Sequence, residues 1–92
     1  MTIRIMLADD HEIFREGMCA LLKRRSDMDV VGQAGDGRTA VSMAKDLVPD
    51  VVIMEIGIPN LNGIEATRQL LADNPKLKVM ALSAHSDGMM VS

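Results

Sequence analysis

Aromatic side chains are nearly absent from this sequence: Phe14 is its only phenylalanine, and it has no tryptophan or tyrosine. A chain of 92 residues can build one small core. That core must therefore be made of aliphatic side chains and of several of the nine methionines, which fill gaps without fixing one arrangement. We expect a plastic core, and the hydrophobic content of 48% excludes a disordered chain.

Cysteine is also scarce, because Cys19 stands alone and cannot form an internal disulfide. It lies among apolar positions of a predicted helix, so we expect a buried thiol in a reducing cytoplasm. No apolar run approaches membrane-spanning length, and the first residues lack the organisation of a signal peptide. The net charge of −3 predicts no nucleic-acid partner. The only basic cluster, residues 23–25, suits the last turn of a helix.

Buried runs and helical patterns alternate along the chain. Strands are predicted at residues 3–8, 28–34, 51–55 and 77–82, and amphipathic helices at residues 11–25, 39–48 and 64–72. The apolar positions that should face the core in the first helix are Ile13, Phe14, Met18, Leu21 and Leu22. We predict one domain over residues 1–92 with a flavodoxin-like, doubly wound α/β fold around a parallel sheet.

Acidic residues stand where two of these strands end. Asp9 and Asp10 follow the first strand, and Glu55 ends the third, directly before a loop rich in Gly, Pro and Asn. The carboxyl ends of parallel strands share one edge of a sheet, so we expect these carboxylates to meet. Like charges at close range raise one another's pKa, and a divalent cation removes that cost. Mg²⁺ suits such oxygen ligands, with the backbone carbonyl of Gly57 as a further donor, and the Ser83 hydroxyl could hydrogen-bond a phosphoryl oxygen.

Two other interpretations concern the same residues. Asp9 and Asp10 could simply begin a helix, with Asp10 as its cap, and remain hydrated. Glu55 and Ser83 at the same edge make this less favoured. For His11, at the loop mouth, the default is a solvated ring, and His85 follows Ser83 closely enough to move with its loop. Transition-metal binding is disfavoured, because the sequence has no Cys or second His at ligand spacing.

Four segments, in order, resemble response regulator receiver domains of two-component systems, specifically the NarL/FixJ (LuxR-type) subfamily. They are residues 7–17 (LADDHEIFREG), 35–40 (GDGRTA), 49–66 (PDVVIMEIGIPNLNGIEA) and 81–84 (ALSA). The resemblance implies strand order 2-1-3-4 and a cytoplasmic bacterial signalling module that controls transcription and is not an ordinary enzyme. It implies a histidine kinase as partner. It also implies Mg²⁺ held by Asp9, Asp10, the acid at position 55 and the Gly57 carbonyl, with Ser83 as the switch hydroxyl.

Glu55 departs from the family, which has aspartate at this phosphoacceptor position. One extra methylene moves the carboxylate by about 1.5 Å, and phosphoryl transfer depends on in-line positioning. We therefore expect a phosphomimetic or a silent receiver, and least of all a slow acceptor, with Mg²⁺ binding weakened by Glu55.

The end of the chain is a second departure. A fifth strand with its lysine, a fifth helix and the usual DNA-binding domain are not found before Ser92, and Lys45, Lys76 and Lys78 do not lie at the required strand end. We expect a fragment that self-associates through its exposed fourth strand or an uncovered sheet face.

Two functions compete with a phosphate-responsive receiver. A dinucleotide-binding half-domain is disfavoured because the turn after the first strand is acidic and lacks the Gly-x-Gly-x-x-Gly pattern. A phosphate-independent interaction module on the receiver fold is the stronger alternative, because Glu55 and the missing lysine both favour it.

Overall fold

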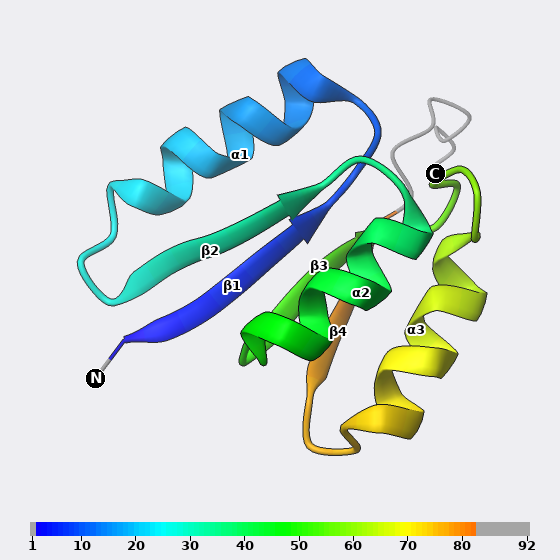
Figure 1. The fold of residues 1–92 in the computed structure, drawn as a ribbon. Coiled ribbons are helices and arrows are strands. Elements are labelled where there is room, and N and C mark those ends of the chain that lie inside the picture. Colours follow the sequence, from blue (N-terminus) through cyan, green and yellow to red (C-terminus); the bar gives the residue numbers. More distant parts are fainter. Residues whose placement is uncertain (1, 83–92) are drawn as a thin grey trace.

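A computed structural model describes residues 2–82 of the chain. Strands and helices alternate along this part (Figure 1) in the order β1 (Ile3–Ala8), α1 (Glu12–Lys23), β2 (Met28–Ala34), α2 (Gly37–Leu47), β3 (Val51–Glu55), α3 (Gly63–Asp73) and β4 (Lys78–Leu82). Every element predicted from the sequence is present. The largest shifts are of two residues: α1 ends at Lys23 and not at residue 25, and α2 begins at Gly37 and not at residue 39.

The strands form one parallel sheet in the order β2-β1-β3-β4, as predicted. Helix α1 lies on one face of this sheet, and α2 and α3 lie on the other (Figure 1). Each connection is a crossover that passes through a helix, which is the right-handed βαβ arrangement of doubly wound folds. This topology makes β1 and β3 neighbours, so the residues that follow them come together.

Both faces of the central strands are buried. On β1, Ile5 and Leu7 pack in the cluster beneath α1, whereas Met6 and Ala8 pack in the cluster beneath α2 and α3. Successive strand residues point to opposite faces, so a strand covered on both sides reads as an unbroken apolar run. Cys19 is buried in the α1 cluster, as expected.

The predicted apolar stripes are wider than the faces that the helices bury. Ile13 and Leu21 of α1 are 87% and 60% exposed, and Ile64 of α3 is 61% exposed. At about 100° per residue, the side of α1 that holds Met18 and Leu22 faces the sheet, and Ile13 lies on the opposite side. The expectation that all five apolar residues of α1 face the core is therefore wrong.

Helix α2 and the loop after β3 are held together at their backbones. The Asp36 carboxylate caps α2 by accepting the Thr39 N–H at 2.8 Å, and the Gly37 N–H donates to the Pro59 carbonyl at 3.0 Å. A Cβ atom at Gly37 would overlap the Leu61 carbonyl oxygen, so only glycine permits this approach. The loop that carries Gly57 is thereby fixed against α2.

We expect two neighbouring leucines of α3 to differ sharply in their contribution to stability. Leu70 is 2% exposed in the core, whereas Leu71 is 38% exposed. Leu70→Ala should lower the free energy of unfolding by about 2–5 kcal/mol, because it removes buried surface and leaves a cavity. Leu71→Ala should cost less than about 1 kcal/mol. Urea unfolding of both variants measures the difference, and equal losses would contradict the orientation of α3.

The cap of α2 gives the stability a dependence on pH. The Thr39 N–H that donates to Asp36 lowers the pKa of that carboxyl below its ordinary value. Ionised Asp36 therefore stabilises the fold above the unfolded-state pKa, and this contribution is lost as the pH falls through the folded-state pKa. Below about pH 4 the wild type should lose stability faster than Asp36→Asn, which caps without titrating. Urea midpoints measured against pH test this, and parallel profiles would refute it.

Candidate functional site

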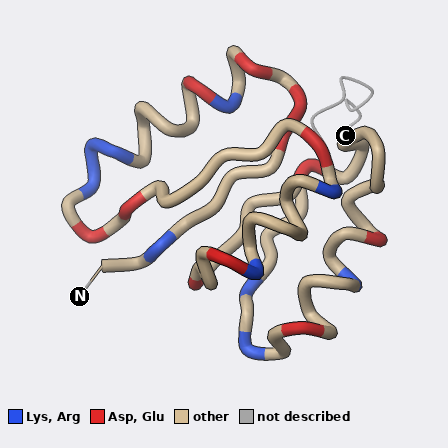
Figure 2. The backbone as a smooth tube through the Cα atoms, in the orientation of Figure 1, with Lys and Arg blue, Asp and Glu red and all other residues tan. Residues whose placement is uncertain are grey.

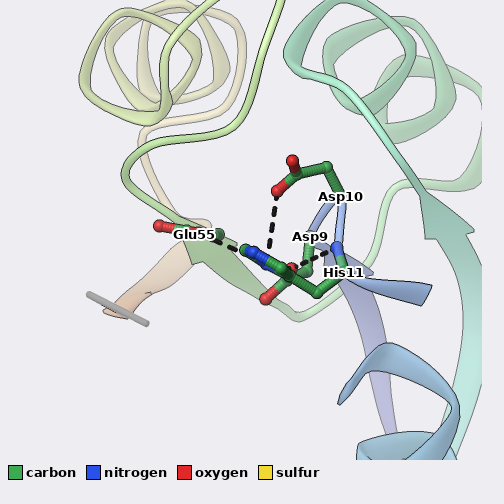
Figure 3. A group of neighbouring side chains, drawn as sticks. All are labelled: Asp9, Asp10, His11 and Glu55. Carbon is green, nitrogen blue, oxygen red and sulfur yellow. Dashed lines mark hydrogen bonds and ion pairs between the residues drawn. The ribbon is translucent and has the colours of Figure 1, made fainter. Parts of the chain in front are cut away.

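The site forms where β1 and β3 end side by side. Ala8 pairs with Met54, so the next residues along each strand, Asp9 and Glu55, are neighbours at the carboxyl edge of the sheet. Asp10 follows in the turn to α1. Figure 2 shows these acidic segments grouped at the same edge, and Figure 3 shows their side chains. The sequence prediction that the three carboxylates meet is confirmed, because they contribute ligand atoms to one cluster with His11.

The three carboxylates differ in exposure. Asp9 and Glu55 are 4% and 1% exposed, whereas the Asp10 side chain is 38% exposed at the rim. Two buried carboxylates with few polar partners are costly, since burial disfavours their charged forms. The cost of burying these two carboxylates must therefore be offset, and the hydrogen bonds of the site offset only part of it.

In each buried carboxylate, one oxygen accepts a hydrogen bond and the other does not. Oδ1 of Asp9 accepts the backbone N–H of His11 at 2.7 Å, and Oε2 of Glu55 accepts the N–H of Gly57 at 2.8 Å. The other oxygens, Oδ2 of Asp9 and Oε1 of Glu55, are buried without a hydrogen-bond partner. Buried acceptors without partners are rare in folded proteins, and an ion is one of the recognised reasons for them. These residues fit a hard divalent cation.

His11 reaches across the acidic cluster (Figure 3). Its ring Nδ1 lies 2.8 Å from Oδ1 of Asp9, 3.4 Å from Oδ1 of Asp10 and 3.9 Å from Oε1 of Glu55. The hydrogen bond with Asp9 raises the pKa of the His11 imidazole above its ordinary value, and the charge of Asp10 adds to the rise. His11 is exposed at the loop mouth, as expected, with about half of its side chain accessible, but its ring also contacts the Asp9 carboxylate.

The start of α1 also differs from expectation. His11, and not Asp10, is the N-cap residue, and its side chain makes no capping hydrogen bond. The Asp10 carboxylate lies beside the His11 ring instead, at 3.4 Å.

Arg15 stabilises the turn between β1 and α1, a role that was not predicted from the sequence. Its Nη1 donates to the Asp9 carbonyl at 2.6 Å, and its Nε donates to Oε1 of Gln33 at 3.2 Å. Arg15 lies four residues after His11, about one helical turn along α1, so its side chain can reach back to the turn. This spacing is the signal that could have identified it. Arg15 joins the ends of β1 and β2 to α1 and so fixes the backbone that carries Asp9.

Of the two remaining predicted site residues, the structure describes only Gly57. Gly57 lies next to the Glu55 carboxylate through its N–H. Ser83 lies outside the described residues, directly after Leu82, which pairs with Glu55 at the end of β4. Among the helices of residues 2–82, none combines the length and apolar character that crossing a membrane requires.

Comparison with known proteins agrees with this geometry. The family model described as "Response regulator receiver domain" matches residues 5–92. The chain belongs to this family. It is 41% identical over 90 residues to the transcriptional regulatory protein DegU of Brevibacillus brevis, covering 98% of this chain and 38% of that protein. It is 38% identical to the response regulator VraR of Staphylococcus aureus, covering 91% of this chain and 40% of that protein.

Solved structures show the same fold. The response regulator domain of Thermotoga maritima CheB superposes with a TM-score of 0.87 at 38% identity, covering 94% of this chain and 63% of that one. A LuxR-family response regulator from Aurantimonas sp. SI85-9A1 gives 0.86 at 38% identity, covering 92% and 61%. This receiver domain is thus homologous to those of LuxR- and NarL-family regulators. The chain spans about two-fifths of the length of the curated relatives that it matches.

Family membership gives the acidic cluster a context. Receiver domains bind Mg²⁺ at an acidic pocket, interact with histidine kinases and can dimerise, and they are not ordinary enzymes. The described part of this chain has an acidic cluster, made of Asp9, Asp10, His11 and Glu55.

Proposed function

We propose that this chain is the regulatory receiver of a cytoplasmic bacterial transcription regulator, with a Mg²⁺ site but impaired phosphoryl acceptance. The proposed ligands are the side chains of Asp9, Asp10 and Glu55 and the backbone carbonyl of Gly57. The observation that carries the proposal is the pair of buried oxygens without partners, Oδ2 of Asp9 and Oε1 of Glu55, in one acidic cluster. Bound Mg²⁺ would supply the charge neutralisation that phosphoryl chemistry needs.

In the reaction typical of the family, a histidine kinase donates the phosphoryl group. A carboxylate oxygen at position 55 would form a new O–P bond as the N–P bond of the kinase phosphohistidine breaks. The Ser83 hydroxyl would then hydrogen-bond a phosphoryl oxygen and couple the modification to a surface change. These roles rest on the family and on the position of Glu55 at the end of β3.

The length of Glu55 argues against efficient acceptance. Its carboxylate stands about 1.5 Å farther from the backbone than that of an aspartate, and errors near 1 Å can cost about a hundredfold in rate. One of its oxygens is engaged by the Gly57 N–H, and the other is buried in the cluster. We therefore propose that Glu55 acts as a fixed negative charge, either mimicking the phosphorylated state or leaving the receiver silent.

Incubation with acetyl phosphate and Mg²⁺ tests this part of the proposal. The wild-type chain should gain no phosphoryl mass by intact-mass spectrometry, because Glu55 is misplaced for in-line attack. Glu55→Asp restores the shorter acid and should gain one phosphoryl group provided that acceptance does not need the lysine of a fifth strand. A matched control, Asp29→Asn, changes an exposed acid on β2 and should behave as the wild type. A clean acyl phosphate on Glu55 of the wild type would contradict the proposal.

The same variants separate mimicry from silence. If Glu55 mimics phosphate, the wild type should match phosphorylated Glu55→Asp in its oligomeric state. If it is silent, the wild type should match the unmodified variant. Glu55→Gln removes the charge. If Glu55 mimics phosphate, this variant should have the oligomeric state of unmodified Glu55→Asp; if Glu55 is silent, its oligomeric state should equal that of the wild type.

A second candidate, a phosphate-independent interaction module, is favoured by the apolar surface around β4. In residues 2–82, β4 is an edge strand paired only with β3. Met80 lies two residues before Leu82 and so on the same face, where Leu82 packs in the cluster beneath α1, but Met80 is 56% exposed. An edge strand with exposed apolar residues promotes pairing with another chain. We propose that copies of this chain associate through β4 and this face.

Light scattering after size exclusion measures that association. The wild-type chain should show a mass that increases with concentration. Met80→Lys should shift it towards the monomer, because burying an unpaired charge is costly. Ile64→Lys is the control, since Ile64 is similarly exposed, at 61%, but lies on α3. A folded wild-type monomer at micromolar concentration would refute the proposal.

A further inference from the structure

The His11 ring lies against the acidic cluster, next to the position that a bound cation would take. We propose that His11 is itself a ligand, which adds a nitrogen donor to the oxygen site, so that the site binds borderline first-row ions such as Co²⁺ more tightly than Mg²⁺. This inference rests on the cation site of the proposed function. It extends that site to a residue that the sequence pattern assigned to solvent.

The distances are those of one coordination shell. A ligand atom from each of Asp9, Asp10, His11 and Glu55 lies within 4.8 Å of the others. Two atoms bound to one ion at about 2.1 Å stand about 3–4 Å apart, depending on the angle between their bonds. The distances from Nδ1 of His11 to the three carboxylates, 2.8, 3.4 and 3.9 Å, lie close to this range.

The unsatisfied oxygens point to a ligand independently of the clustering. Oε1 of Glu55, which is buried without a hydrogen-bond partner, is the atom 3.9 Å from the His11 ring. Oδ2 of Asp9 is likewise buried and without a hydrogen-bond partner. The His11 backbone is fixed by its N–H bond to Asp9, at 2.7 Å, so the ring needs no change of fold to bind an ion.

The donor set determines which ion is favoured. A site of carboxylates and carbonyls suits Mg²⁺, whereas imidazole suits Zn²⁺, Co²⁺ and related ions. Mg²⁺ gains little from nitrogen ligands and retains waters in their place. Removing the ring should therefore weaken Co²⁺ binding far more than Mg²⁺ binding.

Calorimetric titration with Co²⁺ and with Mg²⁺ tests the proposal at mildly alkaline pH, which favours the neutral imidazole that can bind an ion. His11→Gln should lose at least about tenfold in Co²⁺ affinity, because even the outer partners of metal ligands are worth that much. Its Mg²⁺ affinity should stay within about threefold of the wild type. Glu12→Gln, the control, removes the next charge along the chain and should leave the preference for Co²⁺ unchanged.

A second measurement uses the unaltered chain and does not depend on how a variant folds. Bound Co²⁺ should produce paramagnetically shifted ring-proton signals from a coordinated histidine, and these should be absent in His11→Gln. Equal losses for both ions, or tighter binding of both in His11→Gln, would overturn the proposal, since the ring would then be a structural support or a competitor of the cation. If the wild type binds Co²⁺ but not Mg²⁺, the ligand inference stands and the proposed Mg²⁺ function falls; if it binds neither, both fall.

Discussion

Repulsion among carboxylates held at one edge of the sheet is the constraint on which this structure depends. Asp9 and Glu55 are buried beside each other because β1 and β3 are neighbouring parallel strands. Their hydrogen bonds to His11 and Gly57 satisfy only one oxygen of each. The fold stabilises this charge only in part, so the acidic edge is a place where a cation or a cationic side chain changes the energy of the domain.

The fold keeps this edge in place from both sides of the sheet. Arg15 ties the Asp9 carbonyl to α1, and the Gly37 N–H ties the loop after β3 to α2. The two contacts reach the site from opposite faces, since α1 and α2 lie on different sides of the sheet (Figure 1). A change of charge at the acidic edge therefore acts on backbone segments that belong to both helical layers.

The sequence was sufficient to predict the strands and the meeting of the carboxylates, because both depend on local pattern and on parallel topology. Val52 to Met54 form an apolar run that is typical of a strand covered on both faces. The exposure of Ile13 was not predictable, since helical spacing does not show how wide a face the neighbouring sheet covers. The inward turn of His11 was missed because it depends on side-chain torsions and on carboxylates from a distant strand.

Glu55 separates two roles that one aspartate usually combines. A cation ligand needs only an oxygen near the ion, and a flexible longer side chain can supply it at several positions. A nucleophile needs its oxygen in line with the phosphorus and the leaving group, which tolerates far less error. Under the proposed function, the extra methylene impairs phosphoryl acceptance, while the site keeps its negative charge and a reduced affinity for Mg²⁺. Such a receiver would hold one signalling state without a phosphoryl group.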